Sequence, residues 1–161
     1  MRPLLAVLCC AALVLAGCGE SSSTSGGERA AVTPTVTPIP TKPTITKPPG
    51  KEPKTLVKKD IQVGAGRAAK AGDKVSVQYV GVSYTNGRQF DASWDRGQPF
   101  DFTLGNGDVI QGWDQGVAGM KVGGRRQLVI PADLAYGPQG SPPNIGPNET
   151  LIFVIDLLKI G

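Results

Sequence analysis

The stretch Leu-Ile-Phe-Val-Ile-Asp-Leu-Leu (151–158) decides how this 161-residue chain folds. Side chains of a strand point alternately to the two sides of a sheet, and here both sides are apolar except for one aspartate. A strand that is apolar on both sides has to be covered on both sides. The stretch therefore predicts a central strand.

Three upstream segments predict the neighbouring strands. Apolar and polar residues alternate over residues 75–79 and again over residues 100–104, which indicates half-buried strands. A third strand runs through residues 128–130 and ends at Pro131, because proline cannot donate a backbone hydrogen bond to a ladder.

A short helix is expected between these strands. Trp113, Val117 and Met120 recur at helical spacing, but residues 112–119 contain three glycines, each costing about 1 kcal/mol relative to alanine. Such a helix needs packing against the sheet to be stable. The fold class expected is α+β, a curved antiparallel β-sheet wrapped around one short α-helix.

Composition excludes several kinds of chemistry from the C-terminal region. The chain has no histidine, and its cysteines are Cys9, Cys10 and Cys18. Residues 55–161 therefore hold no Ser–His–Asp or Cys–His pair, no His- or Cys-based metal site and no internal disulfide.

The net charge does not indicate a nucleic-acid partner. The formal charge of the chain is +4, but residues 55–161 carry eleven Lys and Arg against ten Asp and Glu. The excess lies in the N-terminal third, and no clustered basic face is evident in the rest. We expect no nucleic-acid binding.

The first residues predict export and a lipid anchor. Residues 1–17 combine an early arginine with an apolar run that is too short to span a bilayer. The run ends in Leu-Ala-Gly-Cys (15–18), which looks like a bacterial lipobox in which Cys18 is lipidated. The alternative is an ordinary secretory signal that contains a cysteine. The expected location is extracytoplasmic, with Cys18 anchored in the bacterial cell membrane.

The next segment predicts a tether. Residues 18–54 are rich in Ser, Thr and Pro, and repeated proline favours extended, disordered chain. Its lysines either lie over anionic lipid or wall polymer, or only keep the tether solvated. Residues 55–161 are left as one compact domain.

Five motifs in this domain occur together in a characteristic order. They are Val-Gln-Tyr-Val-Gly (77–81), Gln-Phe-Asp-Ala-Ser (89–93), Val-Ile-Gln-Gly-Trp (109–113), Ala-Tyr-Gly (135–137) and the stretch 151–158. From about Val75 to the C-terminus the chain resembles the FKBP-type peptidyl-prolyl cis-trans isomerases. The resemblance implies a half-barrel fold and rotation of X–Pro bonds without a cofactor or a metal.

The resemblance also assigns roles to residues of a groove. Trp113 would form its floor, Tyr136 would donate a hydrogen bond to a substrate carbonyl, and Asp91 would orient polar contacts at the rim, held by Tyr79 and Arg96. The substrate-binding residues would be Tyr79, Phe90, Phe100, Val109, Ile110, Ile145 and Phe153. Each of these residues, taken alone, also fits a core or surface position.

Departures from the family pattern occur in the Pro- and Gly-rich loop before the last strand. Ser141 stands where the family commonly has histidine, and Asn144 stands where it has an aliphatic residue. Both changes bear on substrate preference and efficiency.

Two functions compete on these residues. The first is an isomerase that assists protein folding outside the cytoplasmic membrane. The alternative is a non-catalytic chaperone module that holds Pro-containing segments in the same groove. The expected partners are proline-containing proteins or peptides and the membrane. The resemblance adds macrolide ligands, and we expect a monomer.

Overall fold

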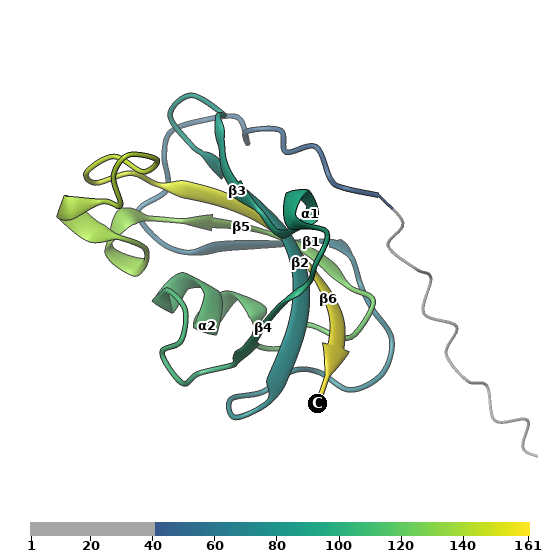
Figure 1. Ribbon diagram of the computed structural model, residues 1–161. Coiled ribbons are helices and arrows are strands. Elements are labelled where there is room, and N and C mark those ends of the chain that lie inside the picture. Colours follow the sequence, from purple (N-terminus) through teal and green to yellow (C-terminus); the bar gives the residue numbers. More distant parts are fainter. Residues whose placement is uncertain (1–40) are drawn as a thin grey trace, which may run out of the picture. The chain divides into compact units, whose positions relative to one another are not determined.

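The structure is a computed structural model that describes residues 41–161 (Figure 1). The predicted signal peptide and Cys18 lie outside the described residues. The elements are, in chain order, β1 (Val57–Gln62), β2 (Lys74–Ser83), β3 (Gln89–Ala92), α1 (Ser93–Arg96), β4 (Phe100–Thr103), α2 (Gln111–Val117), β5 (Arg125–Ile130), the 3-10 turns η1 (Ala132–Leu134) and η2 (Gly137–Gln139), and β6 (Leu151–Ile160). In this range, no helix is both long enough and apolar enough to cross a bilayer.

The strands form one antiparallel sheet in the order β1-β5-β6-β2-β3, and β4 pairs with the first half of β2. Strand β6 pairs with β5 on one side and with β2 on the other. This confirms the prediction of a central strand over residues 151–158. The predicted fold class, a curved antiparallel sheet with one short α-helix against it, is also confirmed by this topology and by α2 (Figure 1).

Helix α2 packs on the inner face of the sheet and closes the main core. Its glycines are explained by this packing. A Cβ added to Gly112 would lie 2.3 Å from Cγ2 of Ile130, and one added to Gly116 would lie 2.4 Å from Cδ1 of Leu128. Both neighbours are fully buried, so neither can move aside cheaply. The glycines let the helix approach the sheet closely, which offsets their low helix propensity.

The opposite, outer face of the sheet is apolar as well. Its side chains form a second buried cluster made of Val80, Val82, Tyr84, Ala92, Val129 and Ile152. Two partly buried residues from outside the sheet, Ile45 and Trp94, pack against this cluster. The central strand is therefore covered on both sides, as its composition requires.

Ile45 belongs to a segment that we call the strap, residues 41–50. The proline content predicts disorder for residues 18–54, whereas the strap contacts the outer face of the sheet. Three side chains of the domain donate hydrogen bonds to its carbonyl groups, Arg125 to Thr41 (2.8 Å), Gln127 to Thr46 (3.4 Å) and Tyr84 to Gly50 (3.4 Å). The ammonium group of Lys47 lies 4.4 Å from the centre of the Tyr84 ring. The predicted domain boundary between residues 54 and 55 stays a prediction.

Candidate active site

A groove with a cavity of about 170 Å³ opens between β2, β3, β4, α2 and the two 3-10 turns. Ten residues line it: Tyr79, Phe90, Asp91, Phe100, Asp108, Val109, Ile110, Trp113, Tyr136 and Phe153. Nine of them are residues that the sequence assigned to the groove. They come from distant parts of the chain, and the sheet and α2 bring them together.

The floor of the groove is the indole of Trp113, which is only 4% exposed. Its ring meets three aromatic rings edge to face, that of Tyr79 at 4.9 Å, that of Phe153 at 5.3 Å and that of Phe100 at 6.1 Å between centroids. This is the arrangement that aromatic pairs prefer, and it fixes the walls at right angles to the floor. The result is a mainly aromatic surface whose rings pack against one another.

The walls depend on one small residue of the central sheet. Gly81 lies on β2 two residues after Tyr79 and therefore faces the same side. A Cβ at Gly81 would lie 2.7 Å from ring atoms of both Phe90 and Phe153. Glycine at this position leaves the space in which these two rings stand against one another, 5.5 Å apart and nearly perpendicular.

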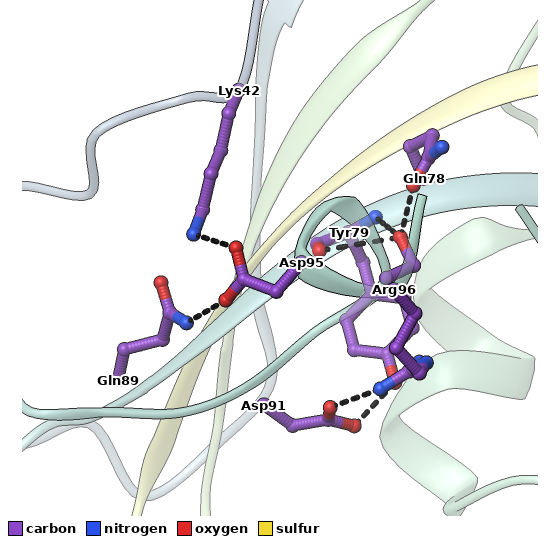
Figure 2. A network of polar contacts seen from close by, with 8 residues as sticks. Lys42, Gln78, Tyr79, Gln89, Asp91, Asp95 and Arg96 are labelled. Carbon is purple, nitrogen blue, oxygen red and sulfur yellow. Dashed lines mark hydrogen bonds and ion pairs between the residues drawn. The ribbon is translucent and has the colours of Figure 1, made fainter. Parts of the chain in front are cut away.

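Charged groups lie at one side of the groove, where Asp91 belongs to its lining. Figure 2 shows the polar network that includes Asp91, Tyr79 and Arg96. Arg96 donates to Asp91 at 2.5 Å and to the hydroxyl of Tyr79 at 2.8 Å, and that hydroxyl donates in turn to Asp91. Burial, followed by the hydrogen bond to Asp91, raises the pKa of Tyr79 to about 12. The hydrogen bonds to Tyr79 and Asp91 raise the pKa of Arg96 as well. The network predicted for these three residues is thus present.

Two hydrogen-bond donors at the groove are free to meet a ligand. Tyr136 lies between the two 3-10 turns with 42% of its surface exposed, and Ile110 precedes the first turn of α2. Within residues 41–161, neither the hydroxyl of Tyr136 nor the backbone N–H of Ile110 donates a hydrogen bond. Burial and the nearby negative charge of Asp91 raise the pKa of Tyr136, so its proton is retained.

One predicted site residue, Ile145, is not among the residues that line the groove. Ile145 is 5% exposed and packs in the main core. The reason is local: Ser141 and Ile145 exchange two backbone hydrogen bonds, which folds the loop back and turns Ile145 inward. Its assignment to substrate binding stays a prediction.

Asp108 lines the groove although the sequence did not single it out as a site residue. Its carboxylate accepts hydrogen bonds from the backbone N–H of Thr103 and from the side chain of Asn106, each at 3.2 Å. The sequence feature that could have pointed to Asp108 as a groove residue is its position directly before Val109 and Ile110.

Comparison with known proteins agrees with this geometry. A family model described as FKBP-type peptidyl-prolyl cis-trans isomerase matches residues 65–158. The FK506-binding protein of Streptomyces anulatus is 58% identical over 120 residues, which cover 74% of this chain and 97% of that protein. A probable FK506-binding protein of Corynebacterium glutamicum is 53% identical over 118 residues, covering 73% and 98%. The solved structure of AtFKBP13 shares 39% identity at a TM-score of 0.62, covering 68% of this chain and 96% of the other. The chain therefore belongs to the FKBP-type peptidyl-prolyl cis-trans isomerases.

Proposed function

We propose that the groove rotates X–Pro bonds of proteins outside the cytoplasmic membrane, and that lipidated Cys18 holds the enzyme there as a monomer. The isomerase activity follows from the family. The proposed location is based on the apolar run near the N-terminus and on the motif Leu-Ala-Gly-Cys (15–18) that ends it. Cys18 lies outside the described residues, so its modification is argued from sequence.

The rotation is opposed by amide resonance, which makes the barrier roughly 18–20 kcal/mol. When the bond twists, the nitrogen becomes pyramidal and the amide loses part of its charge separation. An apolar site favours that less polar state over the planar amide, which prefers water. Trp113 and the aromatic walls supply such a site, and they hold the prolyl ring still while the preceding carbonyl turns.

The observation that carries this mechanism is the pair of free donors above an apolar floor. The Tyr136 hydroxyl and the Ile110 N–H lie at the groove without acceptors in the described part of the chain. A bound peptide supplies carbonyl oxygens that satisfy both of them. The donors fix the peptide backbone on either side of the prolyl ring, so that only the X–Pro bond is left to rotate.

A cis/trans exchange assay on short X–Pro peptides tests the proposal. We expect the chain to accelerate exchange in proportion to its concentration. A chain that binds the peptides but leaves their exchange rate unchanged would favour the binding-module alternative. Competition with FK506 gives a second test, because the relatives named above are FK506-binding proteins. We propose that FK506 occupies the same groove and competes with the peptide.

A further inference from the structure

Helix α1 is too short to be stable by itself. It has four residues and ends at Gly97, which adopts the left-handed conformation that closes the turn. Its first residue is held by the sheet: the Oγ of buried Ser93 accepts a hydrogen bond from the backbone N–H of Tyr79 (2.8 Å) and donates one to the side chain of Gln78. The rest of the helix depends on what its other side chains contact.

Those side chains reach two different parts of the molecule. Trp94 packs against the outer cluster, on the side where the strap lies. Arg96 turns to the groove, where it holds Asp91 and the hydroxyl of Tyr79. The helix is thus a short bridge between the strap side of the sheet and the rim of the groove.

Asp95 ties this bridge to the strap (Figure 2). Its carboxylate accepts from the ammonium group of Lys42 at 2.5 Å and from the side-chain amide of Gln89 at 2.6 Å. These two donors hold the pKa of Asp95 below its usual range, so the ion pair persists at neutral pH. Lys42 is a strap residue, and Asp95 immediately precedes Arg96.

The similarity to relatives extends into the strap. The match to the Streptomyces anulatus protein covers 74% of this chain, so it begins before Ile45 even if it runs to the last residue. It also covers 97% of that protein. The shared unit therefore includes strap residues and is not limited to the segment after residue 54.

We propose that Asp95 and Lys42 are positioning residues of the isomerase, because their ion pair holds α1 so that Arg96 keeps Asp91 and Tyr79 in place at the groove. The proposal rests on the groove described above. It makes the last part of the tether a working part of the enzyme. Asp95 and Lys42 touch no substrate in this account and act only through Arg96.

The test compares kcat/KM on an X–Pro peptide among variants of residues 19–161, the chain without its signal segment and Cys18. We expect Lys42→Ala and Asp95→Asn each to lower kcat/KM about two- to threefold, since the pair is exposed to solvent. The double variant should lose no more than either single variant, and Lys42→Arg should keep the wild-type value. Lys51→Ala is the matched control, because it removes the same charge at an exposed residue that makes no ion pair within residues 41–161.

Two further readings separate positioning from a general loss of stability. In an Arg96→Ala background, Lys42→Ala should have no additional effect, because Arg96 is the group through which it acts. The difference between wild type and Lys42→Ala should also shrink in about 1 M salt, where charges are screened within about 3 Å. An undiminished effect in the Arg96→Ala background, or equal values for Lys42→Ala and Lys51→Ala, would overturn the proposal.

Failure of the isomerase assignment would look different. A wild-type chain without turnover would contradict the proposed function. The affinity for the same peptide, measured by calorimetry, would then report whether the Lys42–Asp95 ion pair affects the groove. We expect the variants to rank in affinity as they rank in kcat/KM. Equal affinities across all variants would overturn the positioning role independently of turnover.

Discussion

Tyr79 serves two purposes in the groove. Its ring stands edge to face against Trp113 and forms part of a wall, while its hydroxyl takes part in the rim network with Asp91 and Arg96. One side chain therefore links the apolar surface that we propose holds the prolyl ring to the charges that border it. A change at either partner of its hydroxyl should be felt in the wall as well as at the rim.

Tyr136 offers a cleaner test of the donor role. Tyr136→Phe removes one hydroxyl from a side chain that is 42% exposed and has no hydrogen-bond partner within residues 41–161. We expect kcat/KM to fall. The loss of transition-state stabilisation should be about 0.5–1.5 kcal/mol, the usual contribution of one hydrogen bond. The melting temperature should not change. Full activity of a folded Tyr136→Phe variant would show that this hydroxyl does not bind the substrate.

The residues at the groove also predict how the rate depends on pH. Residues 55–161 contain no histidine and no cysteine, and the pKa values of Tyr79 and Tyr136 are raised further from neutrality. Bond rotation moves no proton. We expect kcat/KM on an uncharged peptide to stay flat from about pH 6 to about pH 8.5. A slope approaching about tenfold in this range, with folding checked at each pH, would mean that proton transfer takes part.

The raised pKa of Tyr79 predicts how stability falls at alkaline pH. Its pKa in the folded protein is about 12, whereas an unperturbed tyrosine titrates near about pH 10. The unfolded chain loses this proton first, so the contribution of Tyr79 is complete below about pH 10 and is lost as the pH rises towards 12. Denaturant unfolding across this range should therefore show falling stability.

At the scale of elements, the sequence predicted the strands and the helix whose own apolar pattern shows which faces are buried. Strand β6 is apolar on both faces, and it lies at the centre of the sheet. The spacing of Trp113 and Val117 marked α2. Helix α1 was missed because four residues show no periodicity, and its stability comes from Gln78, Gln89 and Lys42 rather than from its own sequence.

The contacts of the strap could not be predicted from the sequence, for a different reason. Proline and threonine in residues 41–50 lower the tendency to form regular structure, and that signal is local. What orders the segment is a distant apolar surface on β2, β5 and β6, together with side chains such as Arg125 and Tyr84. Likewise, the inward turn of Ile145 comes from loop hydrogen bonds that a single sequence does not reveal.

The approach of α2 to the sheet gives a prediction at this scale. Gly116→Ala should improve helix propensity by about 1 kcal/mol, but the added methyl group would lie 2.4 Å from Leu128 in a closed core. Overpacking of this kind typically costs about 1–3 kcal/mol, so we expect a net loss of stability or little gain. Gln115→Ala, at an exposed position of the same helix, is the control and should not destabilise. A clearly stabilised Gly116→Ala variant would contradict the close packing.

At the scale of the whole chain, the extent of the folded unit can be measured. We expect residues 55–161 to unfold cooperatively, because all periodic apolar segments lie there. Residues 41–161 should be more stable by about 1–2 kcal/mol, since Ile45 covers part of the outer cluster. Ile45→Ala in the longer chain should remove most of that difference. Equal denaturation midpoints for the two lengths would show that the strap adds nothing.

The predicted anchor is tested by cell fractionation. Cys18→Ala should release soluble or unprocessed protein from the membrane fraction, because the predicted lipid would be attached at that sulfur. At least two acyl chains are expected, since one binds membranes only marginally. Cys9→Ala is the matched control, because Cys9 is predicted to leave with the signal peptide. A Cys18→Ala variant that fractionates like the wild type would rule out the lipobox.

The two glycines of α2 have one more consequence. Trp113 lies between Gly112 and Gly116, so the distance of closest approach between helix and sheet also sets how deep the indole lies below the mouth of the groove. Ile130 and Leu128 fix that depth, although neither lines the groove. A floor of fixed depth cannot adjust to its occupant. We therefore expect the groove to discriminate its occupant by ring size and to favour the five-membered ring of proline over a larger one.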